Sequence, residues 1–325
     1  MMEISRQHPT IHVVAAVLHD AQGQVLIGER PAGKPLAGFW EFPGGKLEAG
    51  ETARAALSRE LHEELGITVQ EACPLIRFAH DYPERHVELD VWRVLRYAGQ
   101  VQARERQALA WVNPGALADW KLLPADAPIA RILRLPPRML VTPDSGVDEA
   151  AFLDQLNRRL VSGIDFVQLR ESSLDPDRYR ELARRVIGFC HARGARVILN
   201  ADASLAEQLG ADGVQLASHR LLNMTQRPAA ASFLIGASCH DAAQLKHAES
   251  CGLDYIVLGP VLPTATHPGA RVLGWEGFAR LAGISRLPVY AIGGMRAGDL
   301  ERIRVSGGYG VAAIRGLWGD ESVAG

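Results

Sequence analysis

Three glutamates at short spacing are the side chains of this sequence best suited to chemistry. Glu60, Glu63 and Glu64 stand at positions i, i+3 and i+4, so a helix would present their carboxylates on one face. Three like charges at this range repel one another, and a hard divalent cation bound through oxygen relieves the repulsion. The spacing predicts a metal site for Mg²⁺, with Mn²⁺ as the alternative ion, at which a bound water can become a nucleophile. A solvated acidic helix face without metal is the competing interpretation.

The elements around this cluster follow from local composition. Residues 52–65 contain good helix formers and small residues, Gly66 stands where a helix ends, and leucines at every fourth position form a buried stripe. The β-rich segments 11–18 and 24–28, separated by a turn, predict a hairpin. A further strand and a last helix are predicted at residues 86–96 and 126–134. The glutamates are therefore expected on an amphipathic helix that packs against β-structure.

The segment from Gly45 to Ile67 resembles the Nudix box without departure. Gly45 is followed by five residues and Glu51, and then by seven residues and the string RELHEELGI. The resemblance implies a metal-dependent hydrolase that cuts a diphosphate linkage, built as an α/β/α sandwich around a mixed sheet. It also implies that Glu51 pairs with Arg59 and braces the loop against the helix. The metal-binding residues that it implies are Gly44, Glu60, Glu63 and Glu64.

Two further strings, WEFPGGK at residues 40–46 and YPERH at 82–86, resemble the MutT branch of the Nudix hydrolases, the 8-oxo-dGTP diphosphatases that sanitise the nucleotide pool. Glu105 falls where that branch has a further acidic ligand or base. The nucleotide-binding residues implied by position are Arg30, Phe42, Lys46, Arg85 and Asp126. The competing interpretations are surface ion pairs for the two arginines, a core position for the phenylalanine and a surface position for the lysine.

Asp126 stands where the bacterial MutT enzymes have an asparagine that reads the base. Asparagine both donates and accepts hydrogen bonds, whereas an ionised aspartate only accepts. An aspartate can accept from the N7–H that distinguishes 8-oxoguanine from guanine, but it contacts O6 only when it is protonated. This difference leaves a second hypothesis open, in which the hydrolase acts on thiamine-related diphosphates.

The chain changes character at Pro136-Pro137, which cannot continue a helix, and we divide it there into residues 1–135 and 136–325. In the second part, amphipathic stretches, of which residues 217–232 are the weakest, separate short apolar runs. Near-continuous apolar strands indicate a parallel sheet buried on both faces, and eight of them predict a closed (β/α)8 TIM barrel. The runs cover residues 139–142, 166–170, 196–200, 213–217, 233–238, 255–259, 289–294 and 310–314.

From about residue 138 onward, the strings VQLRE, LNADASLA, IGASCH, DYIVLGPVLPTATH and VYAIGGM resemble the thiamine phosphate synthase and TenI family. The resemblance implies a site for a phosphorylated ligand at the C-terminal ends of the strands. The residues implied for this site are Gln168, Arg170, Asn200, His240, Thr264, Gly293 and Gly294. The chain departs from the synthase pattern at five polar positions, namely Ser172, Ala201, Arg220, His267 and Arg315.

These departures weaken one activity of that family more than the other. They replace both metal carboxylates and a pyrophosphate lysine, so pyrophosphate transfer loses its main electrostatic support. The thiazole tautomerisation of TenI-like members needs only a proton shuttle, and His240 matches the histidine of that site. The barrel is therefore expected to bind thiazole phosphate or thiamine phosphate, as a tautomerase or as a ligand sensor without catalysis. Thiamine phosphate synthase activity is the remaining alternative.

Composition narrows the partners to small molecules. The formal net charge is −2 with acids and bases interspersed, so no basic stripe is available for a nucleic-acid polymer. The apolar runs are too short to span a bilayer, and residues 1–10 lack the apolar core of a signal peptide, so we expect a cytoplasmic protein. The four cysteines form no zinc or redox motif and are expected to be reduced, buried thiols. The oligomeric state stays open.

Overall fold

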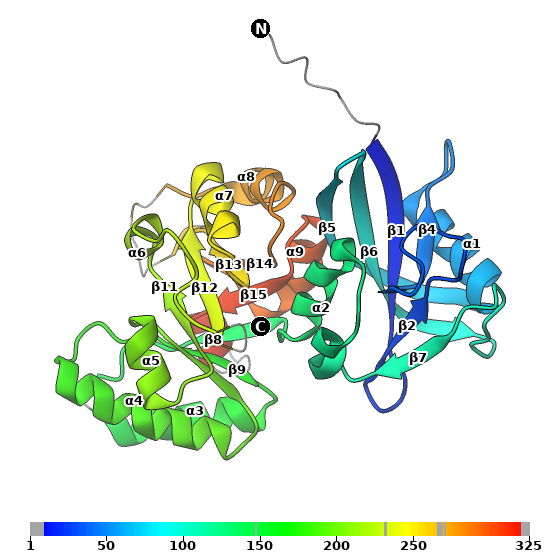
Figure 1. Ribbon diagram of the computed structural model, residues 1–325. Coiled ribbons are helices and arrows are strands. Elements are labelled where there is room, and N and C mark those ends of the chain that lie inside the picture. Colours follow the sequence, from blue (N-terminus) through cyan, green and yellow to red (C-terminus); the bar gives the residue numbers. More distant parts are fainter. Residues whose placement is uncertain (1–9, 147, 231–232, 265–268, 270, 320–325) are drawn as a thin grey trace, which may run out of the picture. The chain divides into compact units, whose positions relative to one another are not determined.

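The computed structural model describes residues 10–146, 148–230, 233–264, 269 and 271–319. The chain separates into two compact units, Met1–Leu135 and Pro136–Gly325. Figure 1 shows that the first unit is rich in strands and that the second is a barrel surrounded by helices. No helix in the described ranges is long and apolar enough to cross a membrane.

The N-terminal unit is built on two sheets. One sheet has the strand order β4-β1-β6-β5, and the other has the order β3-β2-β7. In the first, β1 (Thr10–Leu18) runs parallel to β6 (Arg85–Ala98) and antiparallel to β4 (Gly44–Lys46), which confirms the predicted mixed sheet. The remaining strands are β2 (Val25–Glu29), β3 (Trp40–Glu41), β5 (Thr68–Tyr82) and β7 (Leu109–Val112).

The predicted hairpin between residues 11–18 and 24–28 is wrong. The first two strands meet through one isolated bridge, between His19 and Val25, but they belong to different sheets. The reason is the burial of β1, which is complete on both faces from Val14 to Leu18. A strand buried in this way needs a neighbour on each edge, and β4 and β6 supply them.

Helix α1 (Ala53–Leu65) covers the mixed sheet and contacts β1, β4 and β5. The predicted leucine stripe of Leu57, Leu61 and Leu65 is fully buried, in a core that also contains strand residues such as Val14. The burial of this stripe leaves the polar face of the helix for the glutamates. The remaining helical elements of this unit are α2 (Ala127–Leu133) and two 3-10 helices, Pro114–Asp119 and Pro124–Asp126.

The C-terminal unit is a closed parallel barrel with the strand order β10-β11-β12-β13-β14-β15-β8-β9, which confirms the predicted TIM barrel. Each predicted apolar run overlaps one strand. The strands are β8 (Arg138–Val141), β9 (Phe166–Leu169), β10 (Arg196–Leu199), β11 (Gly213–Leu216), β12 (Leu234–Cys239), β13 (Tyr255–Leu258), β14 (Val289–Ala291) and β15 (Gly310–Ala313).

Helices follow the strands around the barrel and bury their apolar faces against its outer surface. In the described part of the weakest predicted helix, residues 217–230, the structure has only the short α6. The helical elements are α3 (Glu149–Val161), α4 (Pro176–His191), α5 (Ala203–Leu209), α6 (Ser218–Leu222), α7 (Ala242–Ser250), α8 (Gly274–Ala282), a 3-10 helix (Ala297–Asp299), α9 (Leu300–Val305) and α10 (Arg315–Trp318).

Aromatic rings fill the barrel at the N-terminal ends of its strands. Phe166 and Tyr255 begin their strands, and both pack with Tyr290, which also contacts Tyr309. All four side chains are at most 1% exposed. Gly236 leaves room for one ring, since a Cβ there would lie 2.1 Å from Cζ of Tyr255. This end of the barrel is a packed floor.

The cysteines are free, and three of them, Cys190, Cys239 and Cys251, are buried as expected. The expectation is wrong for Cys73, which is only partly buried. Cys73 lies on β5, the edge strand of the mixed sheet, where one flank has no neighbouring strand to cover it.

Candidate active site

The caps of α1 fix where the helix begins and ends, and so fix the position of its glutamates. Thr52 caps the first turn, where the amide of Ala55 donates to its Oγ1 at 3.2 Å. Gly66 ends the helix in the left-handed conformation, with a φ of 71°, and its amide donates to the carbonyl of His62. Together with the buried leucines, these caps fix both the length and the rotation of the helix.

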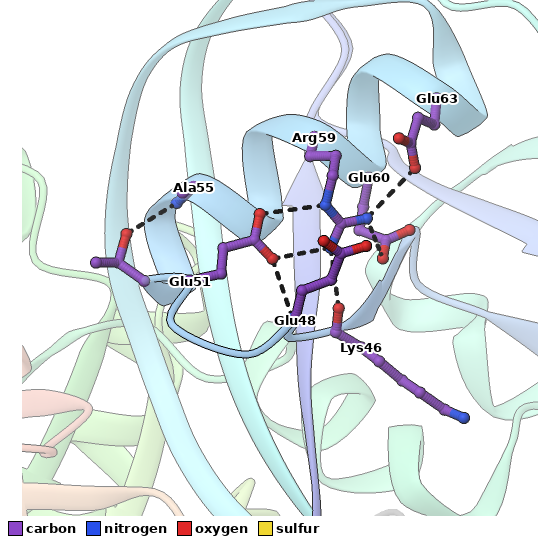
Figure 2. A network of polar contacts seen from close by, with 8 residues as sticks. Lys46, Glu48, Glu51, Ala55, Arg59, Glu60 and Glu63 are labelled. Atoms are coloured by element: carbon purple, nitrogen blue, oxygen red, sulfur yellow. Dashed lines mark hydrogen bonds and ion pairs between the residues drawn. The ribbon is translucent and has the colours of Figure 1, made fainter.

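Arg59 is the centre of a carboxylate network on the outer face of α1, shown in Figure 2. Its Nε and Nη2 donate to the two carboxylate oxygens of Glu51 at 3.1 and 2.9 Å, so the predicted pair is present. Its Nη1 donates to Glu60 at 2.9 Å and to Glu63 at 3.3 Å. Hydrogen bonds with Glu51 and Glu60 raise the pKa of Arg59. Two of the three glutamates predicted to bind metal therefore share one guanidinium.

Glu64 stands one helical turn beyond Glu60, and its printed contact is with a main-chain amide and not with Arg59. Its Oε2 accepts from the amide of Gly44 at 3.1 Å, and no basic side chain in the described residues forms an ion pair with it. Burial raises the pKa of Glu64 to about 8; the hydrogen bond from Gly44 opposes this shift, and repulsion from Glu60 and Glu105 adds to it. With a pKa of about 8, the Glu64 carboxyl is mostly protonated at neutral pH in the absence of metal.

A pocket lies beside Glu64, between β2 and the end of α1. Glu41, Glu64 and Glu105 bring carboxylates from three separate segments to its wall, and Lys34 brings an ammonium that donates to Glu105 at 2.7 Å. The sequence analysis missed Glu41 and Lys34. The signal for Glu41 was its place inside the WEFPGGK string, whereas Lys34 had none. The lining residues are Gly28, Glu29, Pro31, Lys34, Glu41, Pro43, Glu64, Leu65, Glu105, Gln107 and Leu109.

The residues around this pocket fit a hard divalent cation, although no group of three or more acidic, histidine or cysteine side chains is assembled as a metal site in the parts of the chain that the structure describes. The buried and uncompensated carboxyl of Glu64, with like-charged neighbours, is the kind of donor that a divalent ion stabilises. Gly45 keeps the space beside Glu60 open, since a Cβ there would lie 2.3 Å from the carboxyl carbon of that glutamate.

A second group of predicted residues surrounds Asp126. Its carboxyl is 4% exposed, and Oδ2 accepts from the amide of Phe42 at 3.1 Å. Burial raises the pKa of Asp126 to about 8, with a further contribution from Glu41, while the amide of Phe42 and the charge of Arg30 oppose the shift. The side chain of Phe42 is 3% exposed, which is the burial of a core residue.

The remaining nucleotide-site candidates occupy the same neighbourhood, with one exception. Arg30 forms an ion pair with Glu41, and its Nε donates to the carbonyl of Pro35 at 2.9 Å. The guanidinium of Arg85 lies 5.0 Å from the ring centre of Tyr82, and the charges of both arginines act on the hydroxyl of that tyrosine. Lys46 is the exception, because its exposed side chain extends away from the network in Figure 2.

The barrel candidates lie at the C-terminal ends of different strands. His240 follows β12, and its Nδ1 lies 2.6 Å from the carbonyl oxygen of Gly259. Gln168 is 6% exposed, within β9. Gly293 and Gly294 have φ angles of 94° and 70° and pack against residues 260–263, where a Cβ at Gly293 would lie 2.6 Å from Pro260. Thr264 directly follows residues 260–263 in the loop after β13, at the edge of the described residues.

The sequence analysis missed one further polar residue inside the barrel. Gln215 on β11 is 2% exposed, and its Nε2 donates to Oγ of Ser238 at 3.2 Å. Its Oε1 has no hydrogen-bond partner within the described residues. Its only signal in the sequence was its place in the predicted apolar run 213–217, which marks a strand and not a site.

Two of the positions at which the chain departs from the synthase pattern, Ser172 and Arg220, contact nearby carboxylates. Arg170 lies 3.6 Å from a carboxylate oxygen of Asp144, which also accepts from the amide and hydroxyl of Ser172. Arg220 donates to Asp202 at 2.6 Å, so a guanidinium neutralises the acid beside Asn200-Ala201. Arg315 begins α10 with an exposed side chain, and His267 lies outside the described residues.

Comparison with known families agrees with both halves of this description. Residues 14–132 match the family model described as NUDIX domain, and residues 138–317 match the one described as Thiamine monophosphate synthase. A CTP pyrophosphohydrolase of Escherichia coli is 41% identical over 119 residues, which are 37% of this chain and 87% of the relative. An 8-oxo-dGTP diphosphatase of Proteus vulgaris is 42% identical over 95 residues, which are 29% of this chain and 85% of the relative.

The barrel has a comparable relative. A thiamine-phosphate synthase of Chromobacterium violaceum is 35% identical over 196 residues, which are 58% of this chain and 94% of the relative. Each match covers most of the relative's own length. The chain therefore belongs to two families at once, with a MutT-type Nudix hydrolase domain at its N-terminus and a barrel of the thiamine phosphate synthase and TenI family at its C-terminus.

Proposed function

We propose that the N-terminal domain is a divalent-metal-dependent pyrophosphohydrolase that converts 8-oxo-dGTP to the monophosphate and pyrophosphate, with Mg²⁺ as the ion and Mn²⁺ as its substitute. The observation that carries the choice of base is the buried carboxyl of Asp126, whose pKa of about 8 keeps it protonated at neutral pH. In that state Asp126 is both a donor and an acceptor, as the asparagine of the bacterial MutT enzymes is.

The neutral carboxyl matches the edge of the oxidised base. The O–H of Asp126 can donate to O6 of 8-oxoguanine while a carboxyl oxygen accepts from N7–H. Unmodified guanine presents two acceptors, N7 and O6, at the same edge, so one of them would face the carboxyl without a donor. An unpaired buried polar group costs about 1–3 kcal/mol, which corresponds to a preference of roughly tenfold to a hundredfold. Arg30 and Arg85 lie near enough to support the base or the sugar.

The residues of α1 would perform the hydrolysis at the phosphate end. Glu60, Glu63 and Glu64, with the main chain of Gly44, would hold the ion, which when bound neutralises phosphate charge and activates a water. Arg59 holds two of these carboxylates in place through its contacts with Glu60 and Glu63. Glu105, which lines the same pocket as Glu64, would be a further ligand or proton acceptor.

Hydrolysis of CTP is the second candidate, and two observations favour it. The relative from Escherichia coli is named a CTP pyrophosphohydrolase and matches a longer stretch of this chain than the 8-oxo-dGTP diphosphatase does. Cytosine presents a donor, N4–H, beside an acceptor, N3, and this pair also complements the neutral carboxyl of Asp126. Thiamine-related diphosphates are a third class, suggested by the fused barrel alone.

The test is a comparison of kcat/KM for 8-oxo-dGTP, dGTP and CTP on the full-length protein with Mg²⁺, with thiamine pyrophosphate as a competitor. The proposal expects 8-oxo-dGTP to exceed dGTP by at least about tenfold, and to exceed CTP. A higher value for CTP transfers the assignment to the pyrimidine nucleotide. Slow turnover of all three, together with inhibition by thiamine pyrophosphate, would reject both nucleotide assignments.

For the barrel we propose a TenI-like proton transfer on a thiazole phosphate, with His240 as the proton carrier. The contact between Nδ1 of His240 and the carbonyl of Gly259 assigns the proton of the neutral ring to Nδ1, because a carbonyl oxygen only accepts. Nε2 is then the basic atom. Ala201 and Arg220 stand where the synthases carry metal carboxylates, which favours chemistry without a metal.

Calorimetry with thiazole phosphate and thiamine phosphate, followed by an exchange assay in deuterium oxide, tests the barrel assignment. Binding of thiazole phosphate with incorporation of deuterium is the expected result. Binding without exchange would identify a ligand sensor, and the absence of binding to either compound would reject both assignments.

A further inference from the structure

A lysine that no motif predicted holds the acidic wall of the Nudix pocket. Lys34 lies on the loop between β2 and β3, and its Nζ donates to Oε2 of Glu105 at 2.7 Å across 71 positions of sequence. Both side chains keep contact with solvent, at 48% and 41% exposure. The contact therefore joins two solvent-exposed side chains at the rim of the pocket, where each can exchange its partner.

Lys34 is the only basic residue among those that line the pocket, whereas Glu29, Glu41, Glu64 and Glu105 all contribute to the lining. The charges of Glu64 and Glu41 act on the ammonium in addition to the direct contact with Glu105. The nearby Arg30 is already held by Glu41 and by the carbonyl of Pro35. In this structure Lys34 thus supplies the positive charge on the pocket wall, in direct contact with Glu105.

The backbone around Lys34 is anchored, so the ammonium can move without the loop. The amide of Arg30 donates to the carbonyl of Phe39 at 2.8 Å, and the amide of Gly38 donates to the carbonyl of Arg30 at 3.1 Å. Within the loop, the amide of Lys34 donates to the carbonyl of Pro31 at 3.3 Å. Rotation about the flexible stem of the lysine is sufficient to carry Nζ from Glu105 toward a ligand in the pocket.

We propose that Lys34 is the resident counter-ion of the metal pocket, displaced from Glu105 when a divalent cation binds and then available to the phosphate chain of the nucleotide. This inference rests on the divalent-metal site of the proposed function. A cation that enters the pocket must replace the ammonium at the carboxylates, so the lysine weakens the affinity for metal alone. Once displaced, the same charge neutralises phosphate, so the lysine strengthens the affinity for nucleotide in the presence of metal.

The two effects have opposite signs, and this separates the proposal from a structural role. In Lys34→Met the competing ammonium is removed while the apolar stem is kept. We expect the Kd for Mn²⁺ alone to fall about twofold to fivefold, the range for an ion pair between exposed side chains. We expect the KM for nucleotide at saturating Mn²⁺ to rise by a similar factor. Lys246→Met, on α7 of the barrel, is the matched control and should change neither quantity.

The experiment titrates the full-length protein with Mn²⁺ and follows the paramagnetic resonance signal of the free ion, which reports binding without turnover. Unchanged or weaker Mn²⁺ binding by Lys34→Met, in a protein whose parent binds Mn²⁺, would overturn the role of Lys34 and leave the proposed function intact. If the parent itself binds no Mn²⁺, the metal site fails, and the inference fails with it. Thermal unfolding of both variants, compared with the parent, confirms that the fold is retained.

Discussion

The substitution Asp126→Asn tests the protonation of the buried carboxyl directly. Asparagine has nearly the same shape, and its Oδ1 can still accept from the amide of Phe42. The difference between the two side chains is the ionisable proton. The pKa of Asp126 is about 8 in the folded protein, against the ordinary aspartate value of 3.8. The effect of the substitution on stability must therefore depend on pH.

The sign and size follow from linkage. Below pH 3.8 the folded and unfolded states both hold the proton, so Asp126 carries no penalty. Between pH 3.8 and about 8 the unfolded chain releases the proton while the folded protein keeps it, and unfolding becomes easier as the pH rises. Each pH unit of this window contributes about 1.4 kcal/mol, which gives about 1.6 kcal/mol at pH 5 and about 5.7 kcal/mol above pH 8. The substituted asparagine is neutral throughout and escapes this penalty.

Denaturant unfolding of the full-length protein at pH 5 and at pH 8.5 measures the effect, with the Nudix transition followed separately from that of the barrel. The stability gained by Asp126→Asn should be larger at pH 8.5 by about 4 kcal/mol. Asp119→Asn, an exposed aspartate of the Pro114–Asp119 helix, is the control for changes in net charge. An equal effect of Asp126→Asn at the two pH values would refute the assignment of a neutral carboxyl.

Three further substitutions test the two sites. Glu64→Gln removes the buried carboxylate, so kcat/KM for nucleotide should fall by about 10²–10³ while the metal-free fold gains stability at pH 7. Gly45→Ala places a methyl group 2.3 Å from the carboxyl carbon of Glu60, a flexible side chain that can move, so activity should fall with little loss of stability. His240→Asn keeps a donor for the carbonyl of Gly259 but has no basic Nε2, so thiazole proton exchange should fall by about 10²–10⁴ with affinity nearly unchanged.

Gly45→Ala has a control variant, and the other two substitutions each have a result that would contradict the assignment. Gly44→Ala should unfold the Nudix domain where Gly45→Ala does not, because its Cβ would lie 2.0 Å from the main-chain oxygen of Val14 at a φ of 152°. Full activity in Glu64→Gln would remove that residue from the metal site. Loss of thiazole phosphate binding in His240→Asn would indicate that the histidine holds the ligand and does not carry a proton.

The local sequence pattern was sufficient to predict an element where the segment itself contains the residues that start and end it. Helix α1 has a threonine cap, a leucine stripe and a terminal glycine within one stretch of sequence, and its predicted range of 52–65 agrees with Ala53–Leu65. The barrel strands were equally clear, because burial on both faces makes each of them a short apolar run between polar loops.

The pairing of strands and side chains that are distant in sequence could not be predicted from such local patterns. The hairpin prediction failed because the neighbours of β1 lie about 30 and 75 positions further along the chain, at Gly44–Lys46 and Arg85–Ala98. The same limit hid Lys34, whose partner Glu105 is 71 residues away. Its neighbours in sequence, Gly33 and Pro35, indicate only a turn.

The sequence also could not predict which charged groups pair with one another inside the candidate site. The spacing of Glu60, Glu63 and Glu64 was consistent with one shared face, but Arg59 holds the first two, and Glu64 turns toward Gly44 and the pocket. Nor does residue type reveal the protonation of Asp126. That state depends on burial against Phe42 and on the nearby charge of Glu41, both of which arise only when β3 and the 3-10 helix Pro124–Asp126 come together.

The packed aromatic rings close the barrel at the N-terminal ends of its strands, so a ligand can enter only at the C-terminal ends. Phe166, Tyr255, Tyr290 and Tyr309 close the N-terminal end so tightly that a small molecule has no passage along the barrel axis. Whatever binds near His240 must therefore leave by the route through which it entered. A reactant and its isomer would wait for the same opening, so accumulated product would exclude fresh substrate, and the barrel would slow as its own output rises.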